Sequence, residues 1–169
     1  MKKIISIQFA RKRSKETDYR KRLKMILSGK ERFAVRKTSN QIIAQVIKYD
    51  DKGDLVIATA TSLQLKKYGW NLNPKNIPAA YLTGMLAAKI ATSRKIKEAI
   101  LDAGTKKPKS NGRIYAALKG AIDGGLHIPL SEEVLPAEDR ISGKHLKDGA
   151  KATEMFNSVK AKIAGGKNE

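Results

Sequence analysis

The sequence contains no cysteine among its 169 residues. This absence excludes a disulfide-built domain, a zinc or iron–sulfur site with cysteine ligands, and a thiol nucleophile. Aromatic residues make up only 5% of the chain, which argues against the row of rings on which single-stranded nucleic acids stack. The two histidines, His127 and His145, lie in different segments without a spaced metal partner, so we expect structural or surface roles for both.

Long apolar runs are also missing. The longest, residues 79–91, includes Lys89 and falls short of the roughly 20 residues that a membrane-spanning helix needs. The apolar residues near the N-terminus, Ile4, Ile5 and Ile7, are too few for the core of a signal peptide. We therefore expect an intracellular protein without membrane association.

Acidic residues are scarce relative to basic ones. Lys and Arg number 35 against 16 Asp and Glu, a formal net charge of +19. Self-repulsion on this scale opposes folding and exceeds what solubility requires, so it predicts a polyanionic partner. The excess lies near the N-terminus: residues 1–40 hold 14 basic and 3 acidic side chains, whereas residues 101–140 hold six of each. The pattern is typical of a globular body that binds a nucleic acid through a basic arm; a solvated basic face is the alternative.

The start of the chain is predicted to be an arm followed by a helix. Residues 1–16 show no periodicity and contain a basic run, which indicates a basic extended N-terminal arm. Tyr19, Leu23, Ile26 and Leu27 then share one face of a helix. We expect this apolar stripe to dock on the body while the helix presents its cations outward.

The remainder indicates an α/β fold, a single domain with a mixed β-sheet packed by helices and a C-terminal helix. Turn residues separate three strand-like segments, which predicts an antiparallel meander. The predicted elements are strands at 32–37, 42–49, 55–61, 98–102 and 126–128, a helical turn at 62–68, helices at 78–95, 112–123 and 146–164, and an irregular acidic stretch at 129–143.

Motifs for catalysis are mostly absent. The sequence has no Gly-x-x-x-x-Gly-Lys-Ser/Thr loop for nucleotide phosphates, and Ser131 lacks a nucleophile elbow. The enzymatic alternative is a metal-dependent nuclease built from Asp102 and the acids at 132–133 and 138–139, but those pairs also suit helix starts. The acids around Gly53 fit a hairpin turn better than a metal cluster. We therefore predict no enzyme, no metal and no cofactor.

Three segments resemble a known family. The first comprises residues 17–45, with Thr-Asp-Tyr-Arg-Lys-Arg-Leu, Ser-Gly-Lys and Arg-Lys-Thr-Ser-Asn. The second, residues 112–129, begins Gly-Arg-Ile-Tyr-Ala-Ala-Leu-Lys-Gly-Ala and ends Asp-Gly-Gly-Leu-His-Ile-Pro. The third, residues 132–143, carries Glu-Glu, Leu-Pro and Glu-Asp-Arg-Ile-Ser-Gly. Together they resemble large-subunit ribosomal protein eighteen in its archaeal and eukaryotic form, a family that binds 5S ribosomal RNA (rRNA).

The resemblance implies a non-catalytic, cytoplasmic protein seated in the central protuberance of the large ribosomal subunit. There the family joins 5S rRNA to the large-subunit (23S-type) rRNA, beside ribosomal protein five. It divides the chain into a basic N-terminal arm (1–16), an α/β 5S rRNA-binding domain (17–146) and a C-terminal helical extension (147–169). The extension either binds rRNA or closes the fold.

Carried over by position, the family's RNA contacts coincide with the basic regions of the charge map. Tyr19 and Tyr49 offer rings for stacking, but we assign Tyr19 to the apolar stripe of its helix and expect recognition of folded RNA through its backbone and shape. The residues expected to contact RNA are Arg11, Lys12, Arg13, Arg20, Arg22, Arg36, Lys37, Ser39, Asn40, Gln45 and Arg113.

Overall fold

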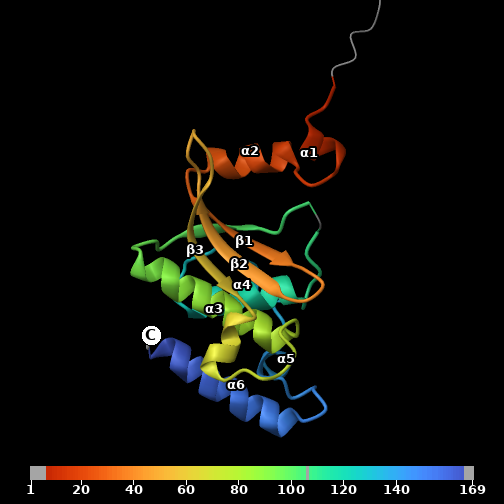
Figure 1. The fold of residues 1–169 in the computed structure, drawn as a ribbon, viewed down its shortest axis with the longest axis vertical. Coiled ribbons are helices and arrows are strands. Elements are labelled where there is room, and N and C mark those ends of the chain that lie inside the picture. The colour runs from red at the N-terminus through yellow and green to blue at the C-terminus, as the bar shows by residue number, and fades with distance from the viewer. Residues whose placement is uncertain (1–6, 106, 166–169) are drawn as a thin grey trace, which may run out of the picture.

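A four-stranded mixed sheet with the order β3-β2-β1-β4 forms the centre of the computed structural model, which describes residues 7–105 and 107–165 (Figure 1). β1 (Glu31–Lys37) pairs antiparallel with β2 (Ile42–Lys48) and parallel with β4 (Ala99–Asp102). β3 (Leu55–Thr61) pairs antiparallel with β2 and forms one edge. The predicted meander, mixed sheet and α/β class are confirmed.

Two helices, α3 (Ile77–Ser93) and α4 (Arg113–Asp123), pack together against the sheet. Asn76 caps α3 by accepting a hydrogen bond from the N–H of Ala79. The helices approach backbone to backbone: a Cβ at Gly84 would lie 1.8 Å from the Ala117 oxygen, and one at Gly120 would lie 2.0 Å from the Tyr81 oxygen. The buried alanines of α3 are small, which lets the helix pack on β2 and β3.

The last helix, α6 (Gly149–Ala164), packs on the outer side of α3. It buries the stripe predicted from the sequence, including Phe156, whose ring centroid lies 5.4 Å from that of Tyr81. Along the long axis of the molecule, α1 and α2 therefore lie at one end, the sheet with α3 and α4 in the middle, and α6 at the other end (Figure 1).

Short elements complete the body. The predicted turn at 62–68 is the 3-10 helix η1 (Gln64–Tyr68). The stretch 129–143, predicted to be irregular, contains η2 (Glu132–Val134) and α5 (Glu138–Ser142), and the acids of both lie in their first turns, where the helix dipole favours them. The strand predicted at 126–128 is reduced to a single bridge between Glu98 and His127. No described helix is long and apolar enough to cross a membrane.

The arm differs from its prediction. Residues 1–6 lie outside the described residues, but the extended conformation is wrong for α1 (Ala10–Arg13), a single helical turn. The chain then folds back, because the carbonyl oxygen of Arg11 accepts hydrogen bonds from the N–H groups of Glu16 and Thr17, and the Arg11 Nε donates to the Thr17 hydroxyl.

Helix α2 (Tyr19–Leu27) is present, capped by Asp18, and its orientation is predicted only in part. Arg20, Lys21 and Lys24 are exposed and Ile26 is half-buried, as expected. Leu23 and Leu27, from the expected docking stripe, are exposed. The cation Arg22 instead points to the body and pairs with Asp54. The cause is the charged surface beneath the helix: buried charges need partners of opposite sign, and an apolar stripe provides none.

Candidate nucleic-acid interface

The two faces of the sheet differ because strand side chains alternate. Phe33 and Val35 of β1 enter the core, whereas Arg36 lies on the opposite face. On that face Gln45 is the neighbour of Thr59 in β3, and its Nε2 donates to the Thr59 hydroxyl at 3.4 Å. Two predicted RNA contacts, Arg36 and Gln45, therefore share the face of the sheet away from α3 and α4.

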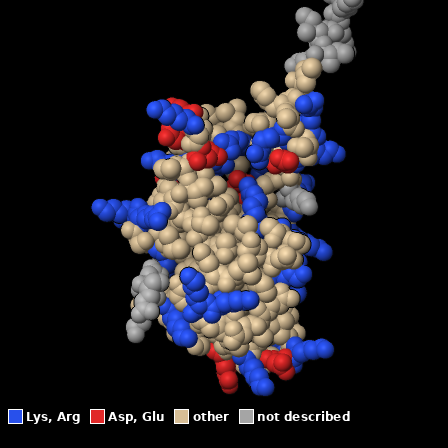
Figure 2. Space-filling view, viewed as in Figure 1, with Lys and Arg blue, Asp and Glu red and all other residues tan. Residues whose placement is uncertain are grey.

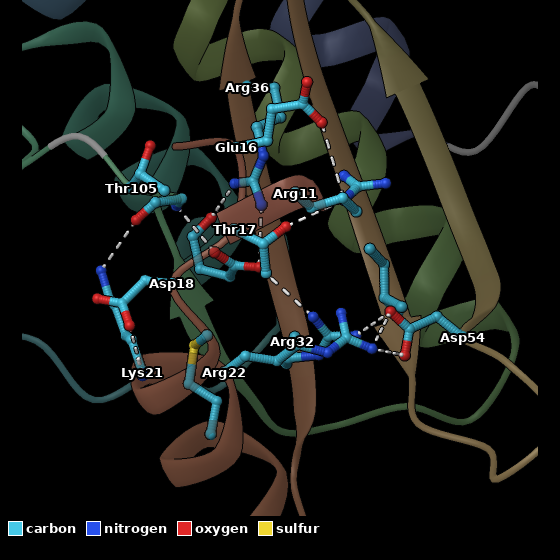
Figure 3. Close-up of a pocket in the computed structure, with 14 residues that line it drawn as sticks. Arg11, Glu16, Thr17, Asp18, Lys21, Arg22, Arg32, Arg36, Asp54 and Thr105 are labelled. Carbon is cyan, nitrogen blue, oxygen red and sulfur yellow. Dashed lines mark hydrogen bonds and ion pairs between the residues drawn. The ribbon is translucent and has the colours of Figure 1, made fainter. Parts of the chain in front are cut away.

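At the end of this face nearest α2, three arginines and two aspartates form a chain of ion pairs; Figure 3 shows Arg22 and Arg32 beside Asp54. Arg22 Nη2 and Arg32 Nη2 lie 2.8 and 2.6 Å from Asp54 Oδ2. Arg32 Nη1 lies 3.6 Å from Asp102 Oδ2, and Arg36 Nη2 lies 3.0 Å from the same oxygen. The chain connects α2, β1, the β2–β3 turn and the end of β4.

The ion pairs give the arginines different roles. Arg32, which the sequence analysis did not single out, has a side chain only 5% exposed and serves the structure. Arg36 is 43% exposed, so its guanidinium is oriented by Asp102 yet remains accessible. Arg22, 32% exposed, is accessible to a lesser extent. The pairing thus presents Arg36 in a fixed direction, which reduces the entropy lost on binding.

The same pairing determines the charge state of Asp54. Burial alone would raise the pKa of the Asp54 carboxyl. Hydrogen bonds and ion pairs from Arg32 and Arg22 outweigh burial and hold the pKa below its ordinary value of 3.8. Asp54 is therefore negative at neutral pH and stabilises both arginines.

The carboxylates do not assemble into the nuclease considered above. Asp102 is bound by Arg32 and Arg36, and among the described residues no group of three or more histidines and acids could hold a metal ion. The acids near Gly53 form the expected turn: the Gly53 N–H donates to the Asp50 carbonyl, and Gly53 has a φ of 145°.

A basic groove of about 450 Å³ runs between the end of β1, the loop after β4 and the start of α4. Five cations line this groove, and Glu16 is the only carboxylate that lines it among the described residues. The groove brings together predicted contacts from distant segments and adds two lysines that the sequence analysis missed. Its cations are Arg36, Lys37, Lys107, Lys109 and Arg113.

Lys75 connects the β1–β2 turn to the start of α4 through two hydrogen bonds. Lys75 Nζ donates to the Ser39 carbonyl at 3.2 Å, and the Lys75 carbonyl accepts from Arg113 Nη1 at 3.0 Å. The predicted contacts Ser39 and Asn40 are exposed in this turn, next to Lys37. The sequence did not predict Lys75 as part of this surface. Its only local signal is its position directly before Asn76, the cap of α3.

The remaining predicted contacts lie at the α1–α2 end. Arg11, Lys12, Arg13 and Arg20 are all exposed, and Arg11 pairs with Glu16 at 3.8 Å. Lys12 and Arg20 line a second hollow, beside Tyr19, which has Thr105 in common with the basic groove. Figure 2 shows Lys and Arg side chains at this end and along both sides of the molecule, with Asp and Glu in small separate groups.

The chain is similar to known proteins over most of its length. A family model described as ribosomal large subunit proteins 60S L5 and 50S L18 matches residues 3–98 and 89–131. The large ribosomal subunit protein uL18 of Korarchaeum cryptofilum (strain OPF8) is 46% identical over 158 residues, covering 94% of this chain and 81% of that protein. The uL18 protein of Thermofilum pendens (strain DSM 2475 / Hrk 5) is 46% identical over 151 residues, covering 89% of this chain and 77% of that protein.

Proposed function

The chain belongs to the uL18 family of large-subunit ribosomal proteins, which are structural rather than enzymatic, and from this premise we propose that it binds 5S rRNA and attaches it to the large-subunit rRNA in the central protuberance. Residues 17–146 form the 5S rRNA-binding domain, and the basic arm before them contributes further contacts, Lys12 and Arg13 among them. Neighbouring ribosomal proteins, ribosomal protein five among them, complete the site.

The observation that carries the proposal is the basic groove. Five cations from three separate segments line it against a single carboxylate among the described residues. A concave surface with this charge attracts a polyanion, and each phosphate bound releases counterions. A guanidinium has five N–H donors. Arg36 and Arg113 use some of theirs on Asp102 and on the Lys75 carbonyl, and the remaining donors can form charge-assisted hydrogen bonds to phosphates.

The shape of the surface favours folded RNA. Arg36 and Gln45 lie on one sheet face, and Ser39 and Asn40 extend from the turn at its edge. These groups can contact phosphates, ribose hydroxyls and exposed base edges along a structured RNA. The chain of ion pairs behind Arg36 holds this surface rigid, so less conformational entropy is lost when RNA binds.

Competition binding tests the proposal. Labelled 5S rRNA is bound at about 150 mM salt, where weak non-specific attraction is reduced, and is challenged with unlabelled 5S rRNA or with tRNA. We expect 5S rRNA to displace the label far more efficiently than tRNA. Equal competition by tRNA would reduce the function to general RNA binding and would contradict the proposal.

A further inference from the structure

Tyr19 and Phe9 form an aromatic pair on the surface of the protein. Their ring centroids lie 5.4 Å apart with an interplanar angle of 50°. Phe9 is 72% exposed and Tyr19 37% exposed, although exposing rings costs hydrophobic stabilisation. Tyr19 is the first residue of α2, so its ring extends from the end of the helix, where Phe9 covers it only in part.

The Tyr19 ring forms one wall of a hollow of about 490 Å³, which we call the Tyr19 hollow. Three cations line it: Lys12, Lys15 and Arg20. Asp18 is the only acid that lines it among the described residues, and its carboxylate already accepts the N–H groups of Arg20 and Lys21 as the cap of α2. The hollow therefore combines one accessible ring with a local excess of positive charge.

This combination fits a nucleotide. A nucleobase stacks on an aromatic ring, and cations around the ring neutralise the phosphates on either side of the base. A hollow of a few hundred Å³ is the size that small organic ligands occupy. Because only one ring lines the hollow in the described part of the chain, it suits a single unpaired base rather than a length of single strand.

We propose that the Tyr19 hollow receives one unpaired base of the RNA held by the basic groove, stacked on Tyr19, with the flanking phosphates on Lys12 and Lys15. The inference rests on the proposed RNA-binding function and deepens it: the groove binds the folded backbone, and the hollow binds one extruded base. Thr105 lines the Tyr19 hollow and the groove alike, so one RNA can reach both.

Three variants test the stacking: Tyr19→Leu, which keeps an apolar side chain but removes the ring, Tyr19→Phe, which keeps the ring, and Tyr49→Leu as the matched control. Tyr49 is 46% exposed and does not line the hollow. We expect Tyr19→Leu to weaken 5S rRNA binding by about 5- to 100-fold, the worth of one stacked base. The slope of log affinity against log salt stays unchanged, because every phosphate contact is kept. Tyr19→Phe and Tyr49→Leu should bind like the wild type.

Ultraviolet crosslinking of the wild-type complex, followed by mass spectrometry, gives a second readout. We expect a nucleotide adduct on the peptide that contains Tyr19 and none on the peptide that contains Tyr49. If Tyr19→Leu and Tyr49→Leu bind 5S rRNA with equal affinity, the stacking is overturned, and the exposed rings would then fit contact with a protein instead. Equal losses in Tyr19→Leu and Tyr19→Phe would assign the effect to the hydroxyl and also overturn it.

The failure of this inference can be told apart from the failure of the proposed function. If the wild type does not prefer 5S rRNA over tRNA, the proposed function fails before any variant is compared. If the wild type shows that preference and Tyr19→Leu binds as tightly as Tyr49→Leu, only the stacking fails. Thermal unfolding of each variant, followed by circular dichroism, verifies that the proteins compared are folded.

Discussion

The guanidinium of Arg32 pairs with the carboxylate of Asp54 across 2.6 Å, from a side chain that is only 5% exposed. The two residues lie on β1 and next to the β2–β3 turn, and Arg22 of α2 meets the same carboxylate. Arg32 Nε has no hydrogen-bond partner in the described part of the chain, so this buried cation depends on Asp54 and, at 3.6 Å, on Asp102. One carboxylate thus joins the N-terminal helix to the sheet.

Asp54→Asn should therefore destabilise the protein. The substitution keeps the shape of the side chain but leaves Arg32 with only its weaker partner, and a buried charge without a counterion is costly. We expect the free energy of unfolding in urea to fall by about 1–3 kcal/mol. Asp50→Asn, in the same turn and exposed, is the matched control and should change it little. An equal effect of both substitutions would contradict the role of the pair.

The stability that Asp54 contributes should disappear in acid. Because its pKa is lower in the folded protein than its ordinary value of 3.8, the contribution is complete above that value and is lost as the pH falls through the folded pKa. Urea unfolding at a series of pH values should show a constant difference between wild type and Asp54→Asn from about pH 7 to about pH 5. Below the ordinary pKa of 3.8 the difference should shrink; a difference that persists there would contradict the assignment.

Gly120 allows α4 to touch α3, and Gly120→Ala should break this contact. The new Cβ would lie 2.0 Å from the Tyr81 carbonyl oxygen and 3.1 Å from the Met85 nitrogen, both backbone atoms that move only with the whole helix. Although alanine favours a helix more than glycine does, we expect a net loss of about 1–3 kcal/mol in unfolding experiments. Gly165→Ala, where the new Cβ would meet its nearest atom at 3.3 Å, should be tolerated.

Phe156→Ala decides between the two roles considered for the C-terminal helix. Phe156 is 4% exposed and packs on Tyr81, so its loss should cost about 3–5 kcal/mol of stability. If α6 closes the fold, 5S rRNA affinity at a temperature where the variant is folded should match that of Glu154→Ala, an exposed control on the same helix. Weaker RNA binding by folded Phe156→Ala would instead assign α6 to the RNA interface.

Local patterns in the sequence predict the elements well. Alternation and turn residues place β1, β2 and β3, and the caps and glycines bound α3 and α4 to within a few residues. The acids at 132–133 and 138–139 mark helix starts, as the preference of acids for the positive end of the helix dipole predicts. These features depend on neighbours in the chain, so a single sequence is enough to read them.

The errors concern partners that are distant in the sequence. The periodicity of α2 reveals an apolar face, but which face docks depends on Asp54, some thirty residues away, and on the buried Arg32. Likewise, the alternation of β1 places Arg32 on the sheet face opposite the core. It does not show that Arg32 is buried there beside Asp54, which Arg22 of α2 also binds. Lys107 and Lys109 were missed because only the tertiary fold brings their loop beside β1. Their one local signal is a Lys-Pro-Lys run shortly before the glycine that precedes α4.

The double variant Lys107→Gln/Lys109→Gln tests whether the basic groove holds phosphates. Both lysines are exposed and line the groove. Removing a phosphate contact lowers the number of counterions released on binding, so the slope of log affinity against log salt should fall in magnitude by about one for each contact removed. We therefore expect weaker 5S rRNA binding, a slope reduced by about one to two, and unchanged thermal stability.

The control, Lys89→Gln, removes an exposed charge from α3, on the opposite side of the sheet, and should leave the slope as in the wild type. If the double variant and the control show the same slope, the phosphates of the RNA lie elsewhere and the groove is not the interface.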